Sequence, residues 1–361
     1  MLEAMREWRT ETLLSGATEL MPLADAEATF RSDETINFDD PFARELLSTA
    51  PLRRLAGIGF LGAIDFIRHG SGRSAHRRRH NRLEHTVGVT RLAETYALEA
   101  GLCQKRRRLL LAAALLHDVG HGPLSHTLEP VFAQAFDVDH HSMTRRIVRG
   151  ETQHGRAVYA ALRAANLDPD DVLAMIDGDH SGIDAFLFAG SINLDTLDGI
   201  VRSRAFMEPR AAPRVMLRAV RRWAQTGRAP LSEFDAFWTL KHDVYTLLIG
   251  GARGRLLDAV ARAYMRANID AFNATDFERN DASLRKRHRQ LFDLLGLIAD
   301  RRAALKDNLP GNLMKDEVVI KDRAFTVRTD KVSNESRHLD ERYTQSKSTR
   351  RVSIEELVEA L

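Results

Sequence analysis

Apolar residues recur every three to four positions along most of the chain, which is the period of an amphipathic α-helix. Val87, Leu92 and Tyr96 form one such face, and a continuous apolar run from Leu109 to Leu116 predicts a fully buried helix. Similar spacing predicts helices over residues 2–14, 42–55, 127–136, 140–148, 153–165, 170–176, 194–206, 214–225, 233–248, 253–272 and 283–304.

The pattern changes after Pro310. Apolar and β-branched residues cluster at 317–320 and again at 324–327, with three charged residues between them, which predicts a small hairpin. Residues 333–350 are polar, and we expect them to be mobile. Ser353 and Glu356 form a capping box that opens a short terminal helix. The expected architecture is an all-α domain at 39–305, with an N-terminal extension at 1–38 and a small C-terminal α+β appendage at 306–361.

Length and composition are those of a globular protein. The chain has 361 residues, 44% of them hydrophobic and 29% charged, which is enough for a large core. No apolar run approaches the ~20 residues that span a bilayer, and charges interrupt Met1 to Trp8, where a signal peptide needs an apolar segment. Cys103 is the single cysteine, so no internal disulfide can form. We therefore expect a cytoplasmic protein without membrane contact.

The net charge of +3 is only mildly basic, but the positive charge is clustered. Arginines and histidines crowd residues 73–82, directly before the candidate ligand His85. A solvated surface loop would explain this run. Because it adjoins a candidate metal site, we favour a rim that attracts phosphate groups.

An adjacent histidine and aspartate, His117 and Asp118, close the apolar run that ends at Leu116. Burying an imidazole and a carboxylate costs several kcal/mol unless a partner compensates them, and a divalent metal is a common partner. Both side chains can reach one ion only where the helix unwinds, and Gly120 and Gly122 are expected to permit that unwinding. The sequence therefore predicts a metal site at the end of this helix.

A longer string of residues surrounds this pair. It runs Arg82-Leu83-Glu84-His85 and later His117-Asp118-Val119-Gly120-His121-Gly122-Pro123-Leu124-Ser125-His126, with Asp195 downstream. The string resembles the HD phosphohydrolase superfamily and, within it, the dNTP triphosphohydrolase branch. The resemblance covers residues 39–206, including the lead-in at 46–55, and implies an HD-domain helical core.

This resemblance implies that one divalent metal ion is bound by His85, His117, Asp118 and Asp195. A mixed set of imidazoles and carboxylates suits Mn, Fe, Zn, Co or Ni, and the residue types do not choose among them. The resemblance also allows Mg²⁺ to accompany the substrate phosphates.

The resemblance assigns further roles around the metal. Arg82 is expected to bind a substrate phosphate, and His121 and His126 are expected to face the phosphate and the sugar side of the scissile bond. Glu129 matches an acidic partner of these histidines. His140 matches a histidine that assists proton transfer, a role that histidine suits because it titrates near neutral pH.

Several positions depart from the family pattern. Thr196 and Gly199 stand where the family has a lysine that grips the triphosphate and a tyrosine that packs on the deoxyribose. Ser203 and Phe60 replace an acidic residue and a glutamine that read the sugar and the base. Asp198 is retained, and we expect it to contact the substrate. The bond chemistry is thus expected to persist on a different or looser substrate.

Three functions remain open. The first is hydrolysis of a (deoxy)nucleoside triphosphate to nucleoside and triphosphate. The second is a nucleotidase or phosphodiesterase that acts on a modified, ribo- or cyclic nucleotide. The third is a nucleic-acid-binding or nucleotide-sensing protein with a non-catalytic HD site, which the arginines along residues 210–222 would serve. The resembling enzymes form dimers or higher oligomers, so we expect a homo-oligomer with a nucleotide as its main partner.

Overall fold

A computed structural model describes residues 38–67, 80–179, 185–208, 215–228, 230–300, 305–331 and 342–361. These residues all belong to one compact unit, Ile36–Leu361. The predicted N-terminal helix at 2–14 and the arginine-rich run at 73–79 lie outside the described residues.

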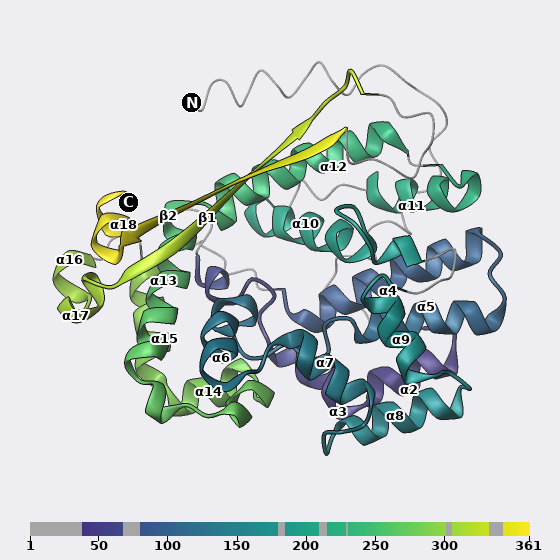
Figure 1. Cartoon of the computed structure of the whole chain (residues 1–361), viewed down its shortest axis with the longest axis horizontal. Coiled ribbons are helices and arrows are strands. Elements are labelled where there is room, and N and C mark those ends of the chain that lie inside the picture. Colours follow the sequence, from purple (N-terminus) through teal and green to yellow (C-terminus); the bar gives the residue numbers. More distant parts are fainter. Residues whose placement is uncertain are drawn as a thin grey trace. The chain divides into compact units, whose positions relative to one another are not determined.

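Helices make up most of this unit (Figure 1). The α-helices are α2 (Pro41–Ser48), α3 (Ala50–Arg54), α4 (Arg82–Glu99), α5 (Gln104–Leu116), α6 (Glu129–Phe136), α7 (His140–Val148), α8 (Gly155–Ala164), α9 (Pro169–Ile176), α10 (Leu194–Met207), α11 (Val215–Thr226), α12 (Leu231–Asp243), α13 (Ala252–Ala267), α14 (Asp281–Arg287), α15 (Arg289–Ala299), α16 (Leu305–Asn308), α17 (Gly311–Met314) and α18 (Ile354–Glu359). The predicted helical core is confirmed.

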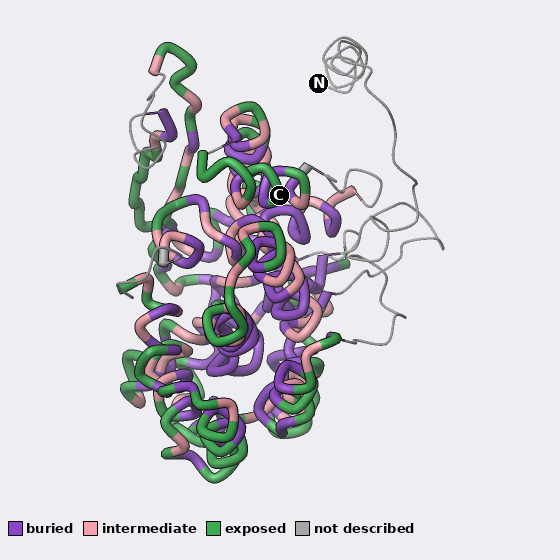
Figure 2. The backbone as a smooth tube through the Cα atoms, turned by 90° about the vertical axis from the view of Figure 1, so that its right-hand side faces the viewer, coloured by how far each residue is buried: buried purple, intermediate pink, exposed green. Residues whose placement is uncertain are grey.

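Helix α5 lies at the centre of this core. Every residue from Leu110 to Leu116 is buried, as the unbroken apolar run predicted. Helix α5 packs against α4, α2 and α9. Helix α4 also packs against α10 and α11. Figure 2 shows buried positions gathered in the interior of the unit and exposed positions on its outer turns. The arrangement brings the C-terminal end of α5 and the first turns of α4 and α10 toward one another.

Two long predicted helices are interrupted. The segment 42–55 breaks at Thr49, whose extended backbone (ψ 148°) separates α2 from α3, and Pro51 favours a new helical start. The segment 283–304 breaks at His288, where ψ is 55° and the imidazole stacks on Phe272 with ring centroids 3.7 Å apart. A third predicted helix, 233–248, ends at Asp243 and continues as the π-helix η8 (Val244–Ile249).

The C-terminal hairpin differs from the prediction. Strand β1 (Glu317–Val327) is continuous and pairs antiparallel with β2 (Tyr343–Ser353). Lys321, Asp322 and Arg323, predicted to form the turn, lie in the middle of β1. Side chains alternate across a strand, so Val318 and Ile320 lie on one face of β1 and Phe325 lies on the other. The charges are tolerated between them because Lys321 and Arg323 are exposed and Asp322 pairs with Arg255.

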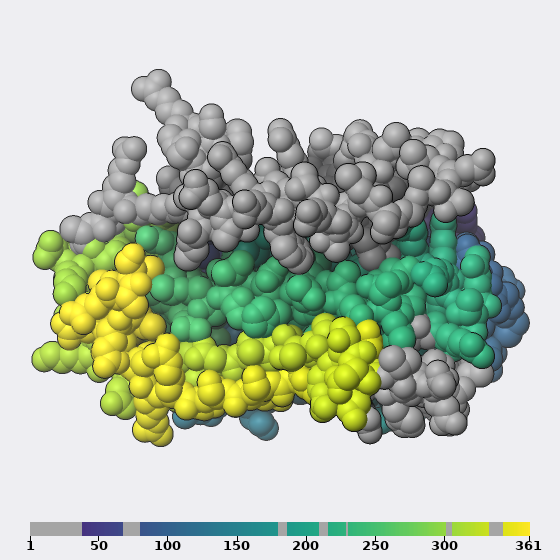
Figure 3. Space-filling model, turned by 90° about the horizontal axis from the view of Figure 1, so that it is seen from above, coloured from purple at the N-terminus to yellow at the C-terminus, as the bar shows by residue number. Residues whose placement is uncertain are grey.

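The second strand was missed because its residues are mostly polar. Only its ends are buried, at Tyr343 and Val352, and the exposed middle gives no hydrophobic alternation. The two-stranded ribbon lies along α12, where Trp238 packs on Phe325 and Tyr343 with ring centroids 5.2 and 5.3 Å away (Figure 3). The predicted capping box of Ser353 and Glu356 is present at α18.

No helix among the described residues has the length and apolar character that a bilayer-spanning segment needs.

Candidate metal centre

The end of α5 presents the His-Asp pair as predicted. The helix stops at Leu116, and His117 and Asp118 occupy the turn that follows. The glycines act differently from the prediction, since Gly120 and Gly122 do not have positive φ values. A Cβ on Gly120 would lie 2.2 Å from the His140 carbonyl oxygen, and one on Gly122 would lie 2.7 Å from Phe277. Glycine is needed here for close packing rather than for a left-handed turn.

Two helix starts bring in the other candidate ligands. His85 lies in the first turns of α4, which Asn81 caps by accepting a hydrogen bond from the Glu84 backbone N–H at 2.9 Å. Asp195 lies in the first turn of α10, where Asn193 and Thr196 form a capping box. Thr196 therefore has a local structural role in capping α10.

The four side chains converge. His85 Nε2 lies 3.3 Å from His117 Nε2, 3.5 Å from Asp118 Oδ2 and 3.0 Å from Asp195 Oδ1. His117 Nε2 lies 3.6 Å from the Asp118 oxygen and 3.9 Å from the Asp195 oxygen. Adjacent ligands bound at ordinary metal–ligand lengths lie about 3.0 to 3.4 Å apart. One ligand atom from each of His85, His117 and Asp118 lies within 4.8 Å of the others, so these three residues could hold a metal ion, and Asp195 approaches the two imidazoles from the start of α10.

Hydrogen bonds on the far side of each imidazole fix which nitrogen faces the centre. His85 Nδ1 donates to Asp198 Oδ2 at 2.7 Å, and His117 Nδ1 donates to the Ala114 carbonyl oxygen at 2.8 Å. In the neutral tautomers that these bonds select, both Nε2 lone pairs point at one region. Two lone pairs 3.3 Å apart repel each other unless a cation lies between them. The donor set therefore fits a divalent metal.

The electrostatics of the centre also favour positive charge. Burial lowers the pKa of His85, but the hydrogen bonds that its ring donates to the Asp195 and Asp198 carboxylates outweigh burial and raise the pKa to about 9. Burial raises the pKa of Asp118, but the charge of the adjacent Arg82 guanidinium and the hydrogen bond with His121 hold it well below its usual value. A protonated imidazole thus substitutes for a cation when no metal is bound.

Arg82 is buried beside the centre, with 3% of its surface exposed. Its Nη1 donates to Asp118 Oδ2 at 2.6 Å and its Nε donates to Ser125 Oγ at 2.9 Å. Ser125 and the preceding Leu124 have left-handed backbones, with φ values of 48° and 56°. Such conformations are costly for residues with side chains and are common at functional sites. The bond from the Leu124 N–H to Asp281 Oδ1 at 2.8 Å helps to hold this turn.

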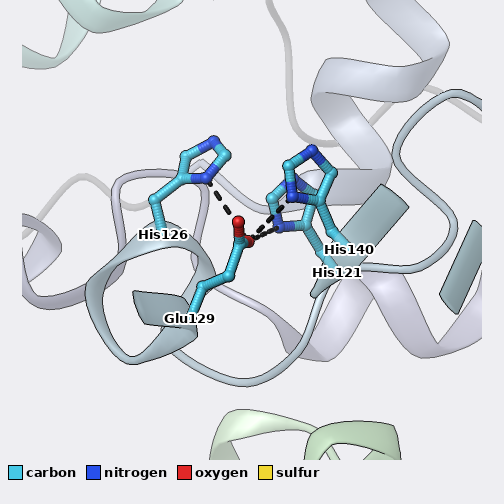
Figure 4. A group of neighbouring side chains, drawn as sticks. All are labelled: His121, His126, Glu129 and His140. Atoms are coloured by element: carbon cyan, nitrogen blue, oxygen red, sulfur yellow. Dashed lines mark hydrogen bonds and ion pairs between the residues drawn. The ribbon is translucent and has the colours of Figure 1, made fainter. Parts of the chain in front are cut away.

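A second cluster lies next to the centre (Figure 4). The Nδ1 atoms of three histidines approach Glu129 Oε2, at 2.8 Å for His140, 3.6 Å for His126 and 3.8 Å for His121. One ligand atom from each of these four residues lies within 4.8 Å of the others, so the set could hold a metal ion. The 2.8 Å contact is the length of an N–H···O hydrogen bond and is shorter than the spacing of two metal ligands. This favours a shared proton.

His121 connects the two clusters. Its Nε2 lies 3.1 Å from Asp118 Oδ1, and its ring stacks on that of His140 with centroids 4.3 Å apart and planes at 6°. Burial and the nearby Arg82 hold its pKa well below the usual value, so His121 is neutral. Burial raises the pKa of Glu129, but hydrogen bonds from His126 and His140 lower it below its usual range. Burial outweighs the hydrogen bond with Glu129 at His126 and lowers the pKa of that imidazole.

Asp198 lies behind the centre rather than facing a substrate. It is 4% exposed, accepts from His85, and accepts two further bonds from Arg202, Nε at 2.9 Å and Nη2 at 3.0 Å. Arg202 also donates to the Glu84 carbonyl oxygen at 2.9 Å. Sequence reasoning missed Arg202, although its i,i+4 spacing from Asp198 on a helix was a usable signal.

Two of the departures from the family pattern meet in space. The Phe60 ring packs on His85, with centroids 4.7 Å apart, and lies 5.0 Å from the Arg82 guanidinium carbon. A Cβ built on Gly199 would lie 3.5 Å from Phe60 and 3.7 Å from His85. Phe60 therefore covers His85 on the side where glycine leaves room for it.

Parts of the chain are similar to known proteins. Residues 82–204 match the HD domain family. The chain is 28% identical over 172 residues to the uncharacterised protein YwfO of Bacillus subtilis, covering 46% of this chain and 37% of that protein. It is 29% identical over 171 residues to the uncharacterised protein MG461 of Mycoplasma genitalium, covering 45% and 38%. The chain thus spans under two fifths of the length of these relatives.

Two more distant similarities bear on the activity and the fold. A deoxynucleoside triphosphate triphosphohydrolase SAMHD1 homolog of Dictyostelium discoideum is 27% identical over 95 residues, covering 24% of this chain and 17% of that protein. The crystal structure of a hypothetical protein from Aquifex aeolicus superposes with a TM-score of 0.57 at 17% identity, covering 90% of this chain and 97% of that one. The latter similarity shows a shared fold.

Proposed function

We propose, on the premise that residues 82–204 form an HD domain of the metal-dependent phosphohydrolase superfamily, that this chain hydrolyses a (deoxy)nucleoside triphosphate to nucleoside and triphosphate. The supporting observation is the pair of Nε2 lone pairs, from His85 and His117, that face each other at 3.3 Å beside two carboxylates. A metal bound there supplies an activated water and neutralises charge at the phosphoryl group.

Arg82 places a fixed positive charge beside the metal ligands. Its bond to Asp118 orients that carboxylate, and its position allows the guanidinium to attract a phosphate oxygen held at the same centre. Because the side chain is buried and held by two partners, it is pre-organised for this contact. The expected contribution is to the rate rather than to metal retention.

The cluster around Glu129 is the proposed proton source for the leaving oxygen. His126 has 63% of its side chain exposed and can reach a substrate, whereas His140 is mostly enclosed and shares a proton with Glu129. Neutral His121 stacks on His140. Its Nδ1 faces Glu129 and its Nε2 faces Asp118, so its ring lies between the two carboxylates. General acid catalysis by such a group contributes a factor of roughly 10² to 10⁴.

A second candidate substrate class is favoured by Phe60. Its ring covers His85 at a position where the family pattern predicts a polar base-reading side chain, and Gly199 removes the expected sugar-packing ring. This supports a nucleotidase or phosphodiesterase that acts on a modified, ribo- or cyclic nucleotide with the same metal chemistry.

A substrate panel separates the two candidates. The chain would be incubated with dNTPs, NTPs, nucleoside monophosphates and cyclic nucleotides, each with Mn²⁺, Fe²⁺, Zn²⁺, Co²⁺ or Ni²⁺, and the products would be separated by ion exchange. Free triphosphate supports the first candidate, and orthophosphate or an opened cyclic ester supports the second. His117→Ala should lose bound metal and turnover, whereas His154→Ala, a change of the exposed histidine just before α8, should keep both. Turnover by metal-free His117→Ala protein would refute both candidates.

A further inference from the structure

Lys241 is a buried cation that forms no ion pair with any of the described residues. It lies near the C-terminal end of α12 with 7% of its surface exposed. Nζ donates to the Ser191 carbonyl oxygen at 3.0 Å and lies over the rings of Trp238 and Phe325, 4.9 and 5.2 Å from their centroids. Within the described part of the chain, no carboxylate lies within 4.0 Å of Nζ. Ammonium groups are rarely buried in this way unless they are paired.

The position of Lys241 relates it to the metal centre. Helices α10 and α12 pack together, and Ser191 lies just before the cap of α10, whose first turn carries Asp195. Asp195 is the carboxylate whose charge acts on Lys241. Of the two candidate carboxylate ligands, Asp195 is the more accessible, with 47% of its side chain exposed against 8% for Asp118. Lys241 therefore adjoins the start of α10, the helix that carries the more accessible of these two carboxylates.

The remaining hydrogen-bonding capacity of the ammonium points to an anion. A lysine ammonium has three N–H donors, and the Ser191 carbonyl takes one. The aromatic rings attract the charge but do not accept strong hydrogen bonds. Of the buried arginines at the centre, Arg82 is already bound to Asp118 and Arg202 to Asp198. A ligand that brings several phosphate groups needs positive charge beyond the metal and Arg82, and Lys241 supplies it.

We propose that Lys241 binds an outer phosphate of the substrate, beyond the phosphoryl group at the metal, and thereby selects nucleoside triphosphates over monophosphates. This inference rests on the proposed function for the identity of the substrate. It does not depend on turnover, because the same contact would bind inorganic triphosphate. Lys241 would be a substrate-binding residue on α12, outside the segment 82–204 that matches the HD domain.

The experiment uses the full chain loaded with Mn²⁺ and inorganic triphosphate as the probe, measured by calorimetry. Lys241→Met keeps the aliphatic stem and removes the charge, and Lys241→Arg keeps the charge. Lys306→Met, a change of an exposed lysine paired with Glu359, is the matched control. Lys241→Met should weaken triphosphate binding about tenfold or more and leave orthophosphate binding within about twofold. Lys241→Arg should restore part of the loss, and the control should match the wild type.

Kinetics give a second measurement if the panel finds a substrate. Lys241→Met should raise KM for the triphosphate about tenfold and change kcat little, because the contact is present in both the ground and transition states. An unchanged affinity for triphosphate in Lys241→Met, or a wild-type protein that does not bind triphosphate, would overturn the proposal. A fall in kcat at constant KM would instead indicate a structural role and would also overturn it. Weakened triphosphate binding in a chain that hydrolyses no nucleotide would support Lys241 and refute the proposed function.

Discussion

Asp198 holds His85 from behind, with its Oδ2 2.7 Å from His85 Nδ1, while Arg202 binds both oxygens of the same carboxylate. All three side chains are at most 4% exposed. The chain Arg202–Asp198–His85 fixes both the tautomer and the ring orientation of one candidate metal ligand. Such carboxylate partners raise the basicity of the imidazole and keep its lone pair on the metal.

The first prediction concerns this chain. Asp198→Asn keeps the shape of the side chain but removes its charge, so metal affinity should fall by roughly 10- to 100-fold. Titration with Mn²⁺ or Zn²⁺, followed by calorimetry, measures the change. Asp177→Asn, a change of a surface aspartate that pairs with Arg145, is the control and should bind metal as the wild type does. Equal affinity in Asp198→Asn and wild type would show that Asp198 does not support the metal ligand.

The second prediction concerns Arg82, whose buried guanidinium compensates Asp118 when no metal is bound. Removing one member of a buried ion pair leaves an uncompensated charge and costs about 3 to 5 kcal/mol. A metal ion on Asp118 replaces much of that compensation. Arg82→Ala should therefore unfold well below the wild type in EDTA, and the gap should narrow when Mn²⁺ is present.

Thermal melts with and without Mn²⁺ test this second prediction. The wild type should itself gain about 2.7 kcal/mol when free metal is a hundredfold above Kd. Arg82→Ala should retain bound metal while losing rate. An identical gap between variant and wild type in EDTA and in Mn²⁺ would contradict a shared role of arginine and metal at Asp118.

The sequence predicted which residues converge at the end of α5 better than it predicted their surroundings. His117 and Asp118 follow a buried helix directly, so local pattern and chemistry coincide there. Lys241 gave no signal, because it is 46 residues beyond Asp195 and meets α10 only through helix packing. The strand β2 also escaped prediction. Its exposed polar middle, with Ser346 and Lys347, is held by pairing with β1 rather than by burial. The positions of Lys241 and β2 both depend on contacts between residues far apart in the sequence, which a local pattern does not reveal.

The third prediction follows from the cost of burying Lys241. Burial lowers its pKa from 10.5 to about 8, although the charge of Asp195 opposes this and that of Arg323 adds to it. Between pH 8 and 10.5, Lys241 binds a proton in the unfolded chain but not in the folded chain. The free energy of unfolding that depends on Lys241 therefore rises with pH across this range. Below pH 8 both states are protonated, and the folded state bears a cost of about 3 kcal/mol.

Lys241→Met should therefore raise the free energy of unfolding at pH 7. The loss of the Ser191 bond removes about 1 kcal/mol, which leaves a net gain of about 1 to 2 kcal/mol. This advantage should shrink as the pH rises from 8 to 10.5. Urea unfolding at pH 7 and pH 10 measures it. A residue retained for ligand binding can cost stability, so a more stable Lys241→Met variant fits that role. A variant less stable than the wild type at pH 7 would mean that Lys241 is retained for the fold.

The fourth prediction concerns Phe60 and Gly199, which share the space over His85. A Cβ at Gly199 already contacts Phe60 at 3.5 Å, so a full tyrosine ring should collide with it. Gly199→Tyr alone should destabilise the fold by about 1 to 3 kcal/mol through overpacking. Phe60→Ala alone should also destabilise, because it uncovers the His85 ring. Together the two changes should cost less than their sum, since the new ring can occupy the space that Phe60 leaves.

A double-mutant cycle by urea unfolding tests this coupling, with an expected interaction free energy of about 1 kcal/mol or more. Leu98→Ala, a change of a largely exposed leucine on α4, combined with Gly199→Tyr provides the uncoupled reference. If Phe60 also limits the substrate, the double variant should shift the preference among nucleotides in the panel, whereas the Leu98 combination should not. Strict additivity of Phe60→Ala and Gly199→Tyr would contradict a shared space. It would also remove the structural reason for expecting an altered substrate at this centre.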